Sequence, residues 1–385
     1  MKVLFLIDTL EVGGAEHSLL DILARFKTVT PLIVHIYMGD TLKSTFEANG
    51  IPVVSLNLKG AYAFRQAIYS VVKLIRLHKP DLLHTTLFRA NFVGRIAGRI
   101  TGIPVTTSFV NESYAPVRLQ KLSPTLRWKY KGTELVDRTT AGLTRHFIAN
   151  SAAIKEANCK VLKVPPDKVS VIYRGRDPET FNKFESEKID YIRQSLGLSD
   201  DEHVFLNVGR FVLQKGQIDL VRALSLVITE IPNCKMLFAG EGLYRSSLED
   251  EVKKLQLTEV VMFLGLRNDI ADLLQLCNLF IFPSYIEGHP GALVEAMFAA
   301  CPIIASDIPV HRETIRDGHT GILVPSSDPA ALTKAIIWML QHPHEAQQMG
   351  KRAQADALQR FHIDQIVAQH ESLYADLLQK VETQT

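Results

Sequence analysis

Short apolar runs alternate with segments of helical periodicity along the whole chain, and this pattern constrains the fold more than any other feature. The runs before residue 180 are 3–7, 32–37, 53–56, 82–84, 105–107, 146–149 and 169–172. Those after it are 204–208, 236–239, 260–264, 279–282, 303–305 and 322–324. Continuous apolar strands that alternate with helices are typical of parallel sheets covered on both faces, so the pattern predicts an α/β fold.

The length of the chain favours two domains. A chain of 385 residues exceeds what one hydrophobic core usually holds, and both halves show the alternating pattern. A polar stretch at 177–200 suggests the boundary, so we expect a first domain at 1–180 and a second at 181–360. Apolar residues lie on one helical face of the last segment, 361–385, which predicts an amphipathic helix that docks back on the first domain.

The cysteines and the apolar runs bear on the compartment. Cys159, Cys234, Cys277 and Cys301 lie far apart and form no C-x-x-C pair, which favours a reducing compartment over a disulfide framework. The first apolar run is interrupted by Asp8 and is too short for a signal peptide. No stretch approaches the roughly 18 apolar residues of a transmembrane helix. We therefore expect a cytoplasmic protein.

Charge is distributed unevenly along the chain. The net charge is +2, but residues 1–180 hold 25 Lys and Arg against 14 Asp and Glu, and the remainder is net acidic. Within the basic half, the acid-free stretch 118–131 interleaves cations with apolar and aromatic residues: Arg118, Leu119, Lys121, Leu122, Leu126, Arg127, Trp128, Lys129, Tyr130 and Lys131. Such a stretch suits an anionic membrane face. A solvated helix with its apolar side on the core explains it equally well.

Two glycine-containing loops are candidates for phosphate binding. Gly13 and Gly14 follow the first expected strand, where a helix N-terminus offers free N–H groups to an anion. This pair is weak evidence, since an ordinary turn has the same sequence and neither a G-x-G-x-x-G fingerprint nor a Walker A motif is present. Arg210 and Lys215 follow the run 204–208, on the side of a parallel sheet where ligands bind. Together they would clamp a diphosphate and stabilise its leaving charge.

The strongest candidate is a pair of carboxylates around a helix start. Glu287 follows the run 279–282, and Glu295 lies on the helix expected after Gly291. The carboxylates can accept hydrogen bonds from hydroxyl groups, and the backbone N–H groups of Gly291, Ala292 and Leu293 can take a phosphate. Helix capping would explain Glu295 but not Glu287. Carboxylate pairs also hydrolyse glycosides, but the neighbouring phosphate-binding features favour a sugar nucleotide.

Taken in order, these motifs resemble those of the retaining glycosyltransferase family 4 over nearly the whole chain. The hallmark E-x7-E is matched by Glu287 and Glu295. The other matching segments are 13–16, 207–210, 215–216, 239–242, 282–284, 295–297, 305–307 and 321–325. The resemblance implies the GT-B fold, an α/β fold with two Rossmann-like domains facing across a cleft.

The resemblance also implies roles for the matching residues. Arg210 and Lys215 would bind the donor diphosphate, Glu295 the ribose hydroxyls and Glu287 the transferred sugar, while Gly14 would lie under the diphosphate on the far wall of the cleft. The family needs no metal, and this chain has no Asp-x-Asp motif, so we expect no cofactor and no metal site.

Two positions depart from the family pattern. Val110 stands where members usually carry a histidine beside the reacting sugar, and Arg174 stands where asparagine is common. Asn111 or Glu112 would be candidates for the missing polar contact. His84, at the end of the run 82–84, is more typical of a structural histidine than of a catalytic one.

We therefore expect a hexosyltransferase that uses a nucleotide-diphosphate sugar and retains the anomeric configuration. Its acceptor would be lipid-linked or a polysaccharide precursor, and the protein would lie peripherally at the inner membrane face. No nucleic-acid partner is expected. A nucleotide-sugar-binding regulator without turnover, and a sugar-nucleotide epimerase or hydrolase, remain as alternatives.

Overall fold

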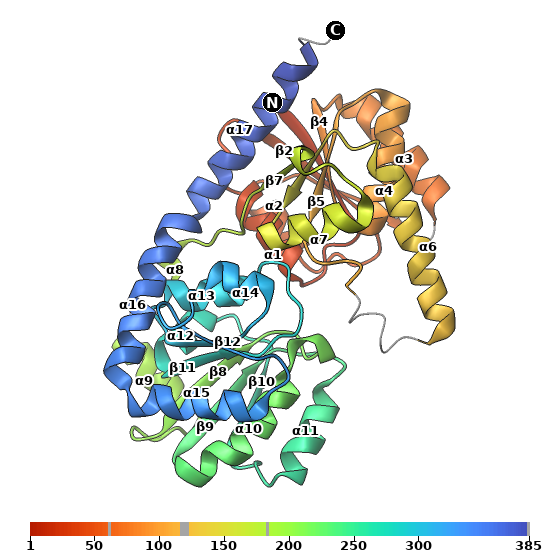
Figure 1. Ribbon diagram of the computed structural model, residues 1–385. Helices are drawn as coiled ribbons and strands as arrows, with labels where there is room; N and C mark the ends of the chain where they lie inside the picture. The colour runs from red at the N-terminus through yellow and green to blue at the C-terminus, as the bar shows by residue number, and fades with distance from the viewer. Residues whose placement is uncertain (61–62, 116–122, 182–184, 383–385) are drawn as a thin grey trace. The chain divides into compact units, whose positions relative to one another are not determined.

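The computed structural model describes residues 1–60, 63–115, 123–181 and 185–382 (Figure 1). It forms two compact units, Met1–Gly175 with Ile363–Thr385, and Arg176–His362. The chain passes between the units twice at neighbouring points, because the Arg176 N–H donates to the Phe361 carbonyl at 3.0 Å and Arg176 forms a parallel bridge with His362. For this reason the units divide at 175 and 362 instead of the expected 180 and 360.

The first unit is built on a parallel sheet of seven strands in the order β3-β2-β1-β4-β5-β6-β7. The strands are β1 (Lys2–Ile7), β2 (Thr30–Tyr37), β3 (Val53–Leu58), β4 (Leu82–Thr86), β5 (Val105–Phe109), β6 (His146–Ala149) and β7 (Val169–Val171). The helices are α1 (Gly14–Leu23), α2 (Lys43–Ala48), α3 (Phe64–His78), α4 (Phe88–Thr101), α6 (Pro124–Ala141), α7 (Ala152–Leu162), η1 (Pro166–Lys168) and α17 (Ile363–Glu382).

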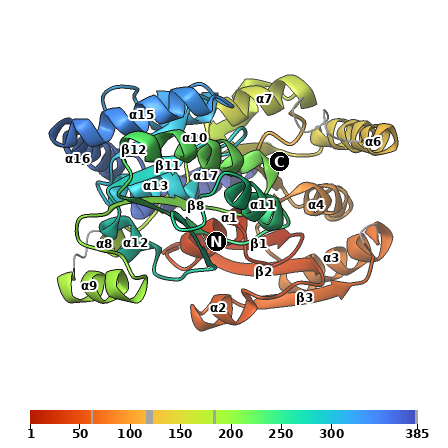
Figure 2. The same ribbon diagram turned by 90° about the horizontal axis from the view of Figure 1, so that it is seen from below.

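Alternation along β1 supplies both faces of this sheet. Val3, Phe5 and Ile7 pack in one buried cluster with α1, α2 and α17. Leu4 and Leu6 point to the other face and pack with α3 and α4. Figure 2 shows α4 lying between α3 and α6.

The helix α17 completes the first unit from the far end of the chain. Its residues Ile366 and Tyr374 are buried in the cluster that contains Phe5, and the rings of Phe5 and Tyr374 are 6.3 Å apart. The face of α17 that packs in this cluster is the apolar face predicted from the sequence. Burial of this face explains why the last segment of the chain returns to the first unit.

The second unit has a parallel sheet of six strands in the order β10-β9-β8-β11-β12-β13. Its strands are β8 (His203–Val208), β9 (Cys234–Ala239), β10 (Val261–Gly265), β11 (Leu279–Phe282), β12 (Ile303–Ser306) and β13 (Ile322–Val324). Its helices are α8 (Pro178–Phe181), α9 (Ser186–Ser195), η2 (Leu213–Lys215), α10 (Gln217–Glu230), α11 (Arg245–Lys254), α12 (Ile270–Leu276), α13 (Gly291–Phe298), α14 (Pro309–Thr314), α15 (Pro329–Gln341) and α16 (Pro343–Arg360).

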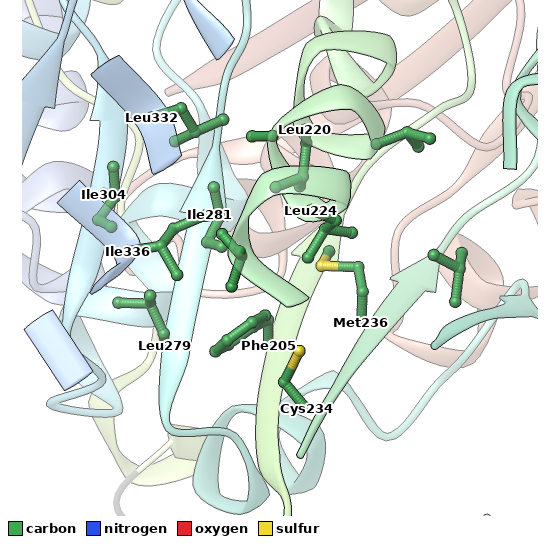
Figure 3. Packing of buried hydrophobic residues seen from close by; sticks show 14 of the residues in the cluster. Phe205, Leu220, Leu224, Cys234, Met236, Leu279, Ile281, Ile304, Leu332 and Ile336 are labelled. Atoms are coloured by element: carbon green, nitrogen blue, oxygen red, sulfur yellow. The ribbon is translucent and has the colours of Figure 1, made fainter. Parts of the chain in front are cut away.

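One face of the second sheet packs against α10 and α15, as Figure 3 shows. Phe205 and Ile281 from the central strands meet Leu224 of α10 and Ile336 of α15, and none of these side chains is exposed. Each apolar run predicted from the sequence overlaps one of the strands of the two sheets, and the expected α/β architecture is confirmed.

Strand order reverses once in each sheet, and these points locate possible ligand sites. In the first unit the reversal lies between β1 and β4, and in the second between β8 and β11. The connections that leave such a pair of strands diverge to opposite sides, which opens a crevice at the carboxyl edge of the sheet. The loops after β8 and β11 are those that carry the predicted cations and carboxylates.

Candidate functional site

Lys215 and Glu287 meet at the strand-order reversal of the second unit. Lys215 ends η2, in the loop after β8, and Glu287 lies in the loop after β11. The Lys215 Nζ donates to Glu287 Oε1 at 2.6 Å, and the two side chains are 19% and 11% exposed. The same Nζ lies 5.0 Å from the centre of the Phe282 ring, a cation–π distance. The two residues predicted from separate motifs therefore form one nearly buried ion pair.

The ion pair controls the charge of the carboxylate. Burial by itself would raise the pKa of Glu287, but the charge of Lys215, its hydrogen bond and the nearby His311 outweigh burial, so the pKa is lowered. Glu287 is therefore ionised at neutral pH, and Lys215 neutralises it. A carboxylate held in this way can accept hydrogen bonds from sugar hydroxyls, while Lys215 keeps two further N–H donors for an anion.

Gly216 sets the close approach of the two loops. It has a positive φ of 65°, and a Cβ at this position would lie 2.1 Å from the Pro283 carbonyl oxygen. A larger residue would push the β8 loop away from the β11 loop and would separate Lys215 from Glu287. The glycine after Lys215 is thus required by packing as well as by backbone conformation.

Arg210 lies in the same loop with its side chain exposed. Over the described part of the chain its guanidinium makes no hydrogen bond or ion pair, whereas its carbonyl accepts from Gln217 Nε2 at 3.2 Å. The backbone is therefore anchored and the cationic group is available to solvent, as a binding site for an anion requires.

The helix α13 presents an uncapped N-terminus beside these loops. Its N-cap is Pro290, and no described side chain caps it. The first backbone N–H groups, those of Gly291, Ala292 and Leu293, have no partner within an α-helix, and the helix dipole makes this end positive. This geometry suits a phosphate, the role predicted for these three residues.

Glu295 has a partner that sequence reasoning missed. Arg176 Nε donates to Glu295 Oε1 at 2.7 Å, and both side chains are largely buried. Glu295 lies in the second turn of α13, which begins at Gly291. The arginine orients one carboxylate oxygen and leaves the other to accept hydrogen bonds. Arg176 stands two positions after Arg174, and no local signal links it to Glu295, 119 positions further along the chain.

His311, from α14, is a second residue that the sequence did not reveal. Its ring packs 5.5 Å from Phe282, and Nδ1 lies 2.7 Å from the Ser306 carbonyl oxygen, which assigns the proton to Nδ1. Burial lowers the pKa of His311 to about 4, so the ring is neutral at pH 7. A buried neutral ring beside Lys215 and Glu287 adds a hydrogen-bonding group without adding charge.

The Gly13 and Gly14 turn opens α1 in the first unit. Gly13 is the N-cap, with extended backbone and no capping side chain among the described residues. A Cβ on Gly13 would meet the Glu16 carboxylate at 2.3 Å, and one on Gly14 would lie 3.1 Å from the Arg174 guanidinium. The turn thus brings backbone N–H groups, a carboxylate and a guanidinium close together.

Asp8 marks the strand-order reversal of the first unit. Its Oδ1 accepts from the Ala90 N–H at 2.7 Å, at the start of α4. Burial raises the pKa of Asp8 to about 6, although this hydrogen bond and Arg89 act in the opposite direction. The neighbouring Leu87 has φ 76° and ψ 156°, a conformation otherwise restricted almost to glycine. A strained backbone at Leu87 and a carboxyl group with a raised pKa, that of Asp8, therefore lie at the same edge of the sheet.

His84 is structural in its contacts. It is buried, and its ring nitrogens lie 2.6 Å from the Tyr374 hydroxyl and 2.6 Å from Ser108 Oγ. Burial lowers its pKa to about 3. The residue therefore links β4 to β5 and α17 as a neutral ring. Val110, the residue at the family's histidine position, directly follows β5.

Helix α6 carries part of the basic and aromatic stretch. Arg118, Leu119, Lys121 and Leu122 lie outside the described residues, so only the remainder can be placed. Trp128 is 76% and Leu135 60% exposed, while Asp137 faces inward. Lys131 Nζ lies 5.9 Å from the centre of the Trp128 ring. The outward face of α6 is therefore both apolar and basic, and the alternative interpretation, that its apolar residues pack on the core, does not apply to Trp128 and Leu135.

The described residues offer neither a metal-binding cluster nor a membrane-spanning helix. Among the described residues, no group of three or more His, Cys, Asp or Glu side chains is arranged to hold a metal ion. In the same part of the chain, no helix combines the length and the apolar character needed to cross a membrane.

Comparison with known proteins agrees with the fold and the motifs. The family model described as Glycosyltransferase Family 4 matches residues 12–180, and the model described as Glycosyl transferases group 1 matches residues 188–356. The UDP-Gal:alpha-D-GlcNAc-diphosphoundecaprenol alpha-1,3-galactosyltransferase of Escherichia coli is 27% identical over 345 residues, which cover 89% of this chain and 86% of that protein.

Solved structures give the same result. The crystal structure of Alr3699/HepE from Anabaena in complex with UDP and glucose is 26% identical, with a TM-score of 0.87, and covers 98% of this chain and 100% of that one. The complex of the same protein with UDP-glucose has a TM-score of 0.86 at 26% identity and covers 97% and 100%. The two parallel sheets and their loops therefore define a glycosyltransferase with the GT-B fold. Within this class, the chain belongs to glycosyltransferase family 4.

Proposed function

We propose that this glycosyltransferase moves a hexosyl unit from a UDP-linked sugar to a hydroxyl group of a lipid-linked acceptor, with retention of the anomeric configuration. The observation that carries the proposal is the Lys215–Glu287 pair at the strand-order reversal of the second unit, with the exposed Arg210 in the same loop. Cations for a diphosphate and a carboxylate for sugar hydroxyls lie together there. The UDP and UDP-glucose complexes of the Anabaena protein support UDP as the nucleotide.

Each side chain has a chemical role in this proposal. Arg210 and Lys215 bind the diphosphate and stabilise the charge that develops as it leaves. The amides of Gly291, Ala292 and Leu293 bind a phosphate at the positive end of α13. Glu295, oriented by Arg176, accepts from the ribose hydroxyls, and Glu287 accepts from hydroxyls of the transferred sugar.

Retention is proposed to occur without a covalent enzyme intermediate. Glu287 is neutralised by Lys215 and is therefore a poor nucleophile. The acceptor oxygen would bond to the anomeric carbon on the face from which UDP departs, as the bond to the diphosphate breaks. The acceptor proton would pass to the departing diphosphate oxygen. Arg210 and Lys215 stabilise the negative charge that develops on the departing diphosphate, so no metal is part of the proposal.

Product analysis tests the proposal. UDP-glucose, UDP-galactose and UDP-N-acetylglucosamine are each incubated with a panel of alkyl diphosphate-linked sugars, and proton NMR of the product identifies its anomeric configuration. We expect an α-linked product from an α-linked donor. A β-linked product would refute retention. Free sugar from donor alone would favour the hydrolase alternative, and nucleotide binding without turnover would favour the regulator.

The lipid-linked acceptor is supported by the outward face of α6. Trp128 and Leu135 can enter a membrane interface while Lys129, Lys131 and Arg138 stay at the level of the headgroups. Each cation near an anionic leaflet contributes about 1 kcal/mol, so a few of them suffice for reversible binding. The acceptor of the Escherichia coli relative carries a diphosphoundecaprenol group, which is consistent with work at a membrane surface.

Liposome sedimentation tests the membrane contact. The wild-type protein should bind anionic vesicles at low salt and bind less at high salt, because screening shortens the range of the attraction. The charge-reversed variant Arg127→Glu/Lys129→Glu/Lys131→Glu should stay in solution. A matched control reverses three basic residues of the same unit away from α6, Lys43→Glu/Arg76→Glu/Lys79→Glu. Equal binding to anionic and neutral vesicles, or equal loss in both variants, would refute the role of α6.

A further inference from the structure

The first unit contains a small, partly open pocket that no step of the proposed reaction uses. It has a volume of about 60 Å³ and lies where α1 and α17 cover the carboxyl ends of β4, β5 and β6. Most of its lining is apolar, with Phe5, Leu19, Phe109 and Ile172 among the lining residues. Val110, which replaces the family histidine, borders it as well.

Two buried polar atoms in this lining have no hydrogen-bond partner among the described residues. They are Ser18 Oγ, on α1, and Asn150 Oδ1, after β6. The two residues are only 7% and 6% exposed. A buried polar atom without a partner costs roughly 1–3 kcal/mol, so a folded protein rarely leaves one without a ligand or a water to complete it.

The orientation of Asn150 is determined by its other contact. Its Nδ2 donates to the Val110 carbonyl at 2.8 Å, so the amide cannot be reversed without placing two oxygen atoms together. Asn150 therefore offers a hydrogen-bond acceptor that needs an N–H or O–H donor. Ser18 offers a hydroxyl that can donate to a carbonyl oxygen.

The histidines and Tyr374 of the pocket are already engaged. His84 is held by Ser108 and by Tyr374, and Tyr374 lies 3.4 Å from His370 Nδ1. Burial lowers the pKa of both histidines, that of His370 to about 4, so they carry no charge at neutral pH. These residues form a neutral wall. Thr86 and Arg174 also line the pocket, and Ser18 and Asn150 supply its buried polar atoms that have no partner among the described residues.

The size and the chemistry of the pocket select one common sugar substituent. At roughly 12 Å³ for each water-sized group, the volume holds about five such groups, and an acetamido group contains about four. An acetamido group supplies one N–H donor, one carbonyl acceptor and one methyl group, which match an amide oxygen, a hydroxyl and an apolar lining. A hydroxymethyl group would leave the apolar volume empty.

We propose that this pocket receives the acetamido group of an N-acetylated amino sugar in the acceptor, with Ser18 Oγ and Asn150 Oδ1 as its hydrogen-bond partners. The assignment to the acceptor rests on the proposed function. The pocket makes the first unit selective for acceptors that carry this group, and α17 contributes to the selectivity by closing the pocket.

Ligand-observed NMR tests the proposal directly. Methyl N-acetyl-α-D-glucosaminide, methyl N-acetyl-α-D-galactosaminide and methyl α-D-glucoside are titrated against the protein saturated with UDP, which occupies the donor site. We expect saturation transfer to be strongest at the acetamido methyl group of at least one N-acetyl glycoside, and its affinity to exceed that of the glucoside about tenfold or more.

Two variants at residue 18 connect the binding to the pocket. Ser18→Ala should weaken binding of the N-acetyl glycoside about two- to tenfold, the effect of one neutral hydrogen bond. It should not lower the melting temperature, because no protein hydrogen bond is lost. Ser18→Leu should fill the pocket with its larger side chain and abolish the preference for N-acetyl glycosides over the glucoside. Ser44→Ala, at an exposed position of α2, is the matched control and should bind as the wild type does.

The outcomes separate this proposal from the proposed function. Equal affinity for N-acetyl glycosides and the glucoside overturns the pocket assignment, and so does a Ser18→Leu variant that keeps the preference. Calorimetry with UDP, which does not depend on the pocket, tests the donor site. Failure of UDP to bind would refute the donor proposal while binding of the N-acetyl glycoside still established the pocket.

Discussion

The Lys215–Glu287 pair allows the donor-site assignment to be tested through stability as well as activity. Removing one partner of a fully buried pair costs about 3–5 kcal/mol, because an uncompensated charge stays behind. These side chains are 19% and 11% exposed, so we expect a reduced cost of about 1–3 kcal/mol for Lys215→Met. Glu287→Gln should cost less, since Lys215 keeps its contact with the Phe282 ring.

The double variant Lys215→Met/Glu287→Gln gives the decisive comparison. If the pair is coupled as its 2.6 Å distance implies, the double variant should be more stable than the sum of the single effects predicts, by about 1–2 kcal/mol. Turnover should fall roughly 100- to 1000-fold in either single variant, since each loses one preorganised contact with the donor.

Urea unfolding of the four proteins at pH 7, at pH 4.5 and at lower pH values measures the coupling. The pKa of Glu287 is lowered by folding, so the pair contributes its full stabilisation above the ordinary value of 4.5 and loses it as pH falls through the lowered value. The coupling should therefore persist at pH 4.5 and above and shrink only in stronger acid. Additive effects, together with near-normal turnover of a UDP-sugar, would refute the assignment.

Two further predictions concern the acid of the first unit and the absence of a metal requirement. The pKa of Asp8 is raised by folding from 3.8 to about 6, so the stability that its protonated form contributes is lost as pH rises through 6. Asp8→Asn should accordingly raise the free energy of unfolding by about 1–3 kcal/mol at pH 8 and change it little at pH 3.5. Urea titrations measure this, and an equal effect of the substitution at both pH values would contradict the reasoning. Turnover should be unchanged in EDTA, because Arg210 and Lys215 stabilise the charge of the leaving diphosphate in place of a metal ion. Activity that is lost in EDTA and restored by magnesium or manganese would show the prediction to be wrong.

The sequence determines the elements of this fold because their signals are local. An apolar run such as 204–208 can only be buried as a strand between two helical layers, and an apolar face such as that of α17 must find a core to cover. For the same reason, the amino-acid sequence alone places the loops that carry Arg210, Lys215 and Glu287 at the carboxyl ends of strands.

The tertiary structure decided which of these residues meet. Strand order places β8 beside β11, so Lys215 meets Glu287, which is 72 positions further along the chain. In the same way, Arg176 meets Glu295, which is 119 positions away in sequence. Nothing in local periodicity marks Ser18 or Asn150, because an unpaired buried atom is defined by what surrounds it in space. Propensity and hydrophobic pattern act over a few residues, whereas hydrogen-bond partners and pockets arise only when the sheet is assembled.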